Sequence, residues 1–93
     1  MCISQKVRVE NMFGLHARPA SKLVNLAKEY KADIYLYKQG QDTIKADCKS
    51  LISVLTLGAK KGTELILHSI GEDAQDAVNK VVDLFENNFY ELA

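Results

Sequence analysis

Positions 14–20 of the chain read Gly-Leu-His-Ala-Arg-Pro-Ala, and an apolar stripe with helical spacing begins directly after them. The stretch contains one of only two histidines and the only proline of the 93 residues. Proline is tolerated in the first turn of a helix because its missing N–H would have no intrahelical partner there. The stretch therefore predicts a histidine at the mouth of a helix N-terminus, with Arg18 two residues away.

The residues that follow predict an amphipathic helix from Pro19 to about Tyr30. Its apolar positions recur at the i, i+3, i+4, i+7 spacing of a helix with one buried face, and they are Ala20, Leu23, Val24, Ala27 and Tyr30. Two starts fit the pattern. Arg18 is one candidate cap, because the residue before a proline resists the α region, and His16 is the other, with a slightly strained first turn.

Alternating apolar and polar residues predict strands at 2–9, 32–37 and 64–69. The turn signal Gln39-Gly40 and residues 43–46 predict a short second arm that pairs with 32–37 as a hairpin.

Ser50 is expected to open a short helix that Gly58 ends. A final apolar stripe from Ala74 to Phe85 predicts a third helix, whereas no pattern predicts the conformation of the tail from Phe89.

The order β-α-β-β-α-β-α predicts an α+β fold, an open-faced β-sandwich in which three helices pack on one face of a four-stranded antiparallel sheet. The other face would stay wet and carry Tyr35, Tyr37, Ile66 and His68. We expect residues 1–93 to form one domain.

The composition narrows the possible partners and locations. Twelve basic and twelve acidic residues give no net charge, which argues against nucleic acid or an anionic membrane as the main partner. Cys2 and Cys48 form no metal-binding pattern and suggest a reducing compartment. We read neither a signal peptide nor an apolar run of about 20 residues. The expectation is a small cytoplasmic protein without metal or membrane insertion.

The chemistry available at His16 is that of a neutral imidazole, a nucleophile near neutral pH. A helix N-terminus supplies unpaired N–H groups and a partial positive charge. A phosphoryl group on the ring would therefore set its oxygens against the N–H groups of Ala17 and Arg18, and the Arg18 guanidinium would add a bidentate contact. A histidine near a helix start also occurs simply as a cap or a solvated residue, so the residues alone leave both interpretations open.

Two separate motifs carry a resemblance to a known family. Residues 14–20 resemble the active-site signature of HPr, the histidine-containing phosphocarrier of the bacterial phosphoenolpyruvate-dependent sugar phosphotransferase system. Residues 49–62, KSLISVLTLGAKKG, resemble that family's regulatory-serine region. The resemblance implies that enzyme I phosphorylates His16 on its pros nitrogen and that IIA components of sugar transport receive the group. Arg18 would be its charge partner. The protein would be a monomeric stoichiometric carrier without a cofactor, not an enzyme.

Ser50 has two interpretations. A serine that opens a helix is ordinarily an N-cap. The resemblance instead implies a phosphorylation site for an HPr kinase/phosphorylase. We hypothesise that a phosphate there would weaken docking with enzyme I.

Leu51, Ile52 and Leu55 cannot all face the core of so short a helix. The resemblance implies that part of this helix forms an apolar docking patch beside the histidine, to which these three residues would contribute. Its rim would include Ala20, Lys28 and Lys49. Contacts with partners would be small and transient, below about 1,200 Å².

Several alternatives remain open from sequence. The pair Met12-Phe13 either packs beneath its loop or is exposed for a partner, and Cys48 is either a small filler or a thiol activated by a helix start. His68 is expected to be a solvent-facing strand residue. Sequence does not separate a carrier for sugar uptake from a carrier of a regulatory branch. A third interpretation is a non-catalytic regulator that binds a transcription factor or an enzyme once Ser50 is phosphorylated.

Overall fold

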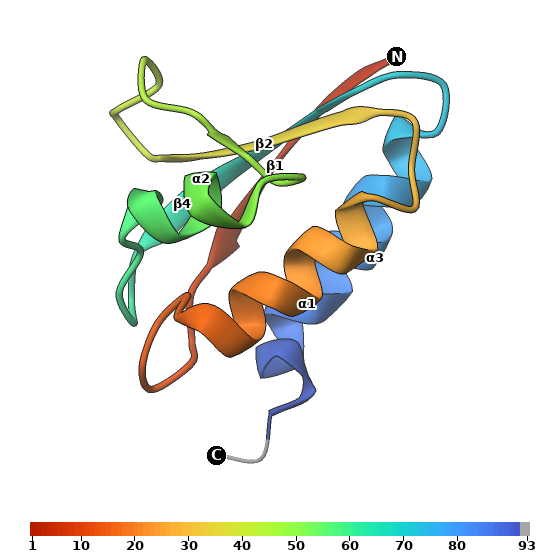
Figure 1. Ribbon diagram of the computed structural model, residues 1–93. Helices are drawn as coiled ribbons and strands as arrows, with labels where there is room; N and C mark the ends of the chain where they lie inside the picture. The colour runs from red at the N-terminus through yellow and green to blue at the C-terminus, as the bar shows by residue number, and fades with distance from the viewer. Residues whose placement is uncertain (92–93) are drawn as a thin grey trace.

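Four strands form one antiparallel sheet in the order β1-β4-β2-β3 in the structure, a computed structural model that describes residues 1–91. The helices α1 and α3 pack against each other, and α2 packs beside α1 near β3 (Figure 1). The predicted α+β open-faced sandwich is confirmed. The elements are β1 (Cys2–Arg8), α1 (Ala17–Ala27), β2 (Asp33–Lys38), β3 (Ala46–Asp47), α2 (Leu51–Leu57), β4 (Glu64–Ile70), α3 (Ala74–Glu86) and the 3-10 turn η1 (Asn88–Tyr90).

The two faces of the sheet differ as the alternating pattern predicts. Leu65 and Leu67 of β4 are fully buried in the core, because successive side chains of a strand point to opposite faces. The open face carries side chains that are only half-buried, and these are the four predicted there: Tyr35, Tyr37, Ile66 and His68.

The start of α1 follows the second of the two candidates. His16 is the N-cap, with an extended backbone (φ −78°, ψ −173°), and Ala17 is the first helical residue. The helix ends at Ala27 and not at Tyr30 as predicted. The amides of Glu29 and Tyr30 donate to the carbonyls of Leu26 and Ala27, three residues back, and these tighter bonds close the last turn.

The second arm of the hairpin is also shorter than predicted. Only Ala46 and Asp47 pair with β2, opposite Leu36 and Tyr35, whereas the prediction was 43–46. The Gln41 amide donates to the Lys38 carbonyl, and the Ile44 amide donates to the Gln41 carbonyl. Two successive turns therefore use the residues that would otherwise extend the strand.

The tail folds back after α3 through three residues with left-handed backbone, Asn88, Phe89 and Tyr90 (φ 52°, 56° and 57°). This conformation costs Phe89 and Tyr90 roughly 1–2 kcal/mol each, and it costs Asn88 less because asparagine tolerates it. Burial of Phe89, whose ring packs 4.8 Å from that of Phe85, offsets part of this cost by about 1.5–3 kcal/mol. Lys22 Nζ adds a hydrogen bond of 2.7 Å to the Phe89 carbonyl. The tail is thereby fixed beside α1; residues 92–93, also part of that tail, lie outside the described residues.

None of the helices in residues 1–91 combines the length and the apolar character needed to cross a membrane.

Candidate functional site

The loop that carries His16 is fastened to the loop between α2 and β4. Gly14 has a left-handed backbone (φ +68°) and lies against Ala59. The Leu15 amide donates to the Ala59 carbonyl at 2.9 Å, and Leu15 itself is buried. This close approach fixes the backbone two residues before the histidine.

The His16 imidazole is partly exposed at the start of α1. Its side chain is 38% exposed, and within residues 1–91 it makes no capping hydrogen bond to the helix. The first intrahelical bond runs from the Ala20 amide to the His16 carbonyl at 3.0 Å. The amides of Ala17 and Arg18 precede it and have no intrahelical acceptor. The helix therefore presents N–H donors and the positive end of its dipole beside an imidazole, an arrangement that suits an anion.

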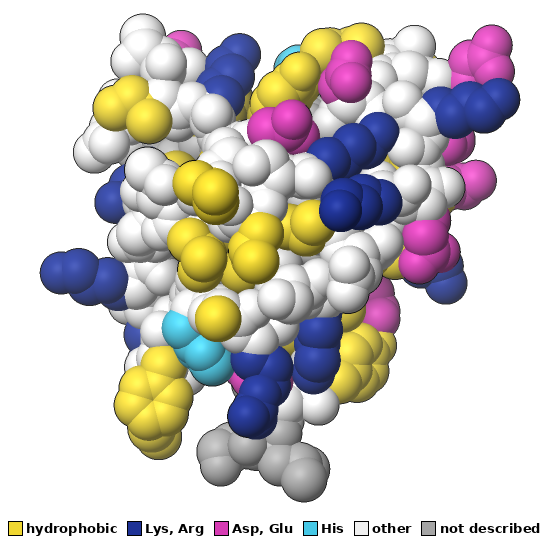
Figure 2. All heavy atoms as spheres, in the orientation of Figure 1, with side chains coloured by type: hydrophobic (Ala, Val, Ile, Leu, Met, Phe, Trp, Pro, Cys, Tyr) yellow, Lys and Arg dark blue, Asp and Glu magenta, His cyan; other side chains and the backbone are white. Residues whose placement is uncertain are grey.

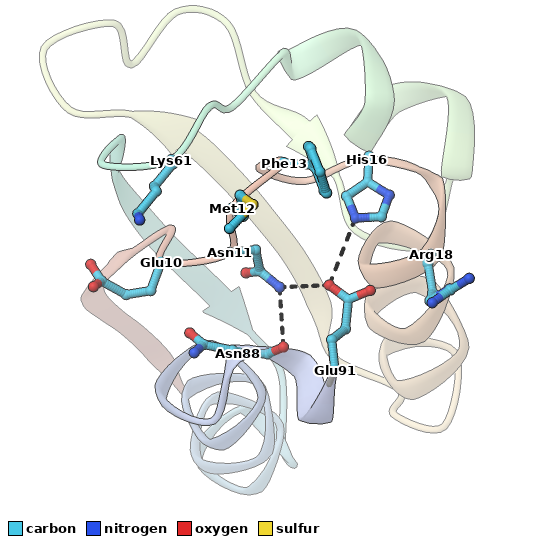
Figure 3. Close-up of a pocket in the computed structure, with 9 residues that line it drawn as sticks. All are labelled: Glu10, Asn11, Met12, Phe13, His16, Arg18, Lys61, Asn88 and Glu91. Atoms are coloured by element: carbon cyan, nitrogen blue, oxygen red, sulfur yellow. Dashed lines mark hydrogen bonds and ion pairs between the residues drawn. The ribbon is translucent and has the colours of Figure 1, made fainter. Parts of the chain in front are cut away.

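A cleft of about 460 Å³ opens at the histidine. It is lined by the loop 10–13, the start of α1, Lys61 and the tail residues Asn88 and Glu91 (Figure 3). Arg18 lines the cleft, but its guanidinium points away from the imidazole (Figure 3) and forms no ion pair with any described residue. The structure thus brings His16 and Arg18 to one cleft and leaves the arginine head group unpaired at its edge.

Glu91 is a member of this cleft that the sequence did not reveal. Its Oε1 lies 3.7 Å from His16 Nε2 and accepts a hydrogen bond of 2.8 Å from Asn11 Nδ2. The same Asn11 nitrogen donates to the Asn88 carbonyl at 3.1 Å. No local sequence pattern predicts the contact between Glu91 and His16, because it depends on the path of the tail after α3.

The pair Met12-Phe13 is exposed, which answers the question that the sequence left open. The two side chains are 67% and 77% exposed. The Phe13 ring meets the His16 ring edge-on, with centroids 6.0 Å apart. An apolar edge therefore borders the imidazole on the loop side.

The helix α2 adds a second apolar surface beside the histidine. Ile52 is 77% exposed, and Leu51 and Leu55 are more than a third exposed, so all three leave the core to Val54 and Leu57. Figure 2 shows hydrophobic side chains gathered directly above the histidine at the lower edge of that face. Leu51, Ile52 and Leu55 together form what is called the α2 patch.

The predicted rim of this patch needs one correction. Lys28 is exposed, and Lys49 is half-buried with its Nζ donating to the Tyr30 carbonyl at 2.7 Å. Ala20 is fully buried and cannot contact a partner. It lies on the same face of α1 as Leu23 and Val24, so the helix packs it into the core.

Ser50 caps α2 as expected. Its Oγ accepts a hydrogen bond from the Ser53 amide at 3.3 Å, and Gly58 ends the helix with a left-handed backbone (φ 62°). The serine therefore lies next to Leu51 of the α2 patch, and its phosphorylation stays a prediction.

Two other reactive side chains lie away from the cleft. His68 is on the open face of the sheet, where its Nδ1 is 2.8 Å from Ser4 Oγ. Cys48 is fully buried; burial first, and the Asp47 charge second, raise the pKa of its thiol. Cys48 is therefore a small core residue and not an activated thiol. In the described part of the chain no group of three or more potential ligand side chains could hold a metal ion.

Comparison with known proteins connects these features to one family. Residues 3–87 match the family profile described as PTS HPr component phosphorylation site. The phosphocarrier protein HPr of Pseudomonas aeruginosa is 37% identical over 86 residues, which cover 92% of this chain and 93% of that protein. The phosphocarrier protein NPr of Escherichia coli K12 is 32% identical over 91 residues, covering 98% and 99%. A crystal structure of HPr from Thermoanaerobacter tengcongensis superposes with a TM-score of 0.88 at 31% identity, covering 98% of this chain and 99% of that one.

Proposed function

The chain belongs to the HPr family of phosphocarriers of the phosphotransferase system, and from that premise we propose that His16 accepts a phosphoryl group and passes it on. The observation that carries the proposal is the partly exposed imidazole at the N-cap of α1, beside amides that lack intrahelical acceptors. The donor is phosphorylated enzyme I, and the acceptors are IIA components.

The transfer requires positioning and charge stabilisation more than covalent chemistry. The lone pair of His16 Nδ1 attacks phosphorus, and the bond from phosphorus to the donor breaks with its electron pair returning to the donor. The phosphoryl oxygens then face the amides of Ala17 and Arg18. The unpaired Arg18 guanidinium swings in to add a charge-assisted contact. Release to the acceptor reverses these steps, so the protein is a stoichiometric carrier.

Labelling with radioactive phosphoenolpyruvate and enzyme I tests the proposal. The chain is expected to take up label that is labile in acid and stable in base, and His16→Ala is expected to take up none. His68→Ala is the matched control, because that histidine lies on the open face of the sheet. Label that persists in His16→Ala, or that is lost only in His68→Ala, would contradict the proposal.

The α2 patch supports the proposed mode of docking. Leu51, Ile52 and Leu55 expose apolar surface, and we propose that the exposed Lys28 and the half-buried Lys49 form its rim. A patch of this kind suits a small transient interface, steered by opposite charge on the partner.

A second function is favoured by the position of Ser50 at the border of the α2 patch. We infer that a kinase adds a phosphate there, with about −2 charge, and that the charge slows acceptance from enzyme I. The modified protein would then serve a regulatory branch or bind a regulator. Ser50→Asp mimics the charge and retains a capping oxygen, and Ser50→Ala is the uncharged control. If enzyme I phosphorylated His16 of Ser50→Asp as fast as His16 of the parent, the proposed inhibition would be wrong.

A further inference from the structure

Glu91 reaches the imidazole from the side opposite to the proposed chemistry. Its Oε1 lies 3.7 Å from Nε2, while the other ring nitrogen is turned away from the carboxylate (Figure 3). The separation exceeds a charge-assisted hydrogen bond by about 1 Å, and catalytic contacts of this kind often tighten only when the reacting partner is bound.

The carboxylate is held in place by its surroundings. The Glu91 side chain is only 13% exposed, and Asn11 Nδ2 donates to Glu91 Oε1 at 2.8 Å. Asn11 is itself buried and oriented by the Asn88 carbonyl, which accepts from the same nitrogen at 3.1 Å. If the Asn11 side-chain oxygen took the place of Nδ2, it would face two acceptors, the Glu91 carboxylate and the Asn88 carbonyl. The hydrogen bonds therefore fix the orientation of the Asn11 amide.

The tail that carries Glu91 is anchored at Phe89, two residues before it. Phe89 fills the core next to Phe85, and Lys22 Nζ donates to the Phe89 carbonyl at 2.7 Å. The left-handed backbone of Asn88 to Tyr90 is a costly conformation that persists only where the surroundings enforce it. The turn places a carboxylate at the histidine and not in open solvent.

We propose that Glu91 is a positioning residue that accepts the Nε2–H of His16 and thereby leaves the lone pair on Nδ1. The inference rests on the proposed role of His16 as the phosphoryl acceptor. A carboxylate at one imidazole nitrogen selects the tautomer that carries its proton there.

The same contact assists the transfer step. When Nδ1 attacks phosphorus, a bond forms at Nδ1 while the proton stays on Nε2, so positive charge develops on the ring. The Glu91 carboxylate stabilises that charge from across the ring, away from the incoming phosphoryl oxygens. When the bond to phosphorus breaks, Nδ1 recovers its electron pair and the proton has not moved.

Glu91→Ala tests the inference, and Glu86→Ala, at the exposed end of α3, is the matched control. The first measurement is the ¹⁵N chemical shift of both His16 ring nitrogens in the unphosphorylated protein, at about pH 8.5 where imidazoles are neutral. The parent and Glu86→Ala are expected to show the Nε2–H form alone. Glu91→Ala is expected to show a mixture of the two tautomers.

The second measurement is the rate of phosphorylation by enzyme I. Glu91→Ala is expected to lose about tenfold, the rate equivalent of one charge-assisted hydrogen bond, while its thermal unfolding midpoint stays that of Glu86→Ala. The inference requires both changes; an unchanged tautomer or an unchanged rate overturns it. A parent protein that takes up no phosphate at all would instead refute the proposed function, since the tautomer measurement does not depend on transfer.

Discussion

Gly14 lies so close to Ala59 that a Cβ atom added to the glycine would stand 2.4 Å from the Ala59 carbonyl oxygen. That oxygen already accepts a hydrogen bond from the Leu15 amide. The loop that carries His16 and the loop that follows α2 are thus joined through backbone atoms. The relative position of the histidine and the α2 patch depends on this contact.

Replacing Gly14 with alanine is expected to destabilise the protein by at least about 2 kcal/mol. A left-handed backbone alone costs a non-glycine residue roughly 1–2 kcal/mol, and the clash with a carbonyl adds to it. Gly40→Ala is the control, because Gly40 also has a positive φ but nothing within 4 Å of the added carbon. Urea unfolding of both variants checks the difference, and equal losses would show that the contact with Ala59 does not constrain the loop.

Replacing Ile52 with serine is expected to slow phosphorylation by enzyme I several-fold and to leave the free energy of unfolding within about 0.5 kcal/mol of the parent. The side chain is 77% exposed, and exposed substitutions seldom affect stability. Ile44→Ser is the control, since Ile44 is 63% exposed on the loop before β3. A rate equal to that of the control would remove Ile52 from the docking surface.

Asp73 makes stability depend on pH at the acid end. The Lys31 amide donates to its carboxylate at 2.9 Å and the Ala32 amide at 2.8 Å. These bonds, that from Lys31 first, hold the pKa of the carboxyl below its ordinary value.

The stabilisation is therefore present above the unfolded pKa of about 4 and is lost as the pH falls through the lower folded value. Asp73→Asn is expected to be less stable than the parent at pH 7, and the difference is expected to shrink below about pH 4. Urea unfolding across this range measures it. Asp42→Asn, in the exposed loop after β2, is the control and is expected to show no such pH-dependent difference. A difference between Asp73→Asn and the parent that stays constant with pH would refute the role of the Asp73 charge.

The local signals of the sequence predict most of the fold. The alternating segments became β1, β2 and β4 because apolar residues on one face of each pack into or against the core. The cap residues Ser50 and Gly58 delimit α2 as expected. The apolar stripe of α1 also places Ala20 towards the core. The expectation of Ala20 at a docking rim conflicted with that stripe and was wrong.

The features that the sequence did not reveal depend on contacts between distant segments. Glu91 lies beside His16 at the end of a tail in which Phe89 enters the core and three left-handed residues follow α3. The short β3 results from turns whose hydrogen bonds compete with strand pairing. Periodicity and capping rules describe residues that are neighbours along the chain, so they carry no information on contacts between distant segments.

The role of His16 as phosphoryl carrier is tested most directly by locating the phosphoryl group on the phosphorylated protein. Protein labelled with ¹⁵N in its histidines is phosphorylated by enzyme I, and the ³¹P–¹⁵N coupling is recorded. A single coupled nitrogen is expected, Nδ1 of His16, and its signal is expected to disappear when a IIA component is added. Coupling to Nε2, coupling to His68, or a phosphoryl group that the IIA component does not remove would contradict it.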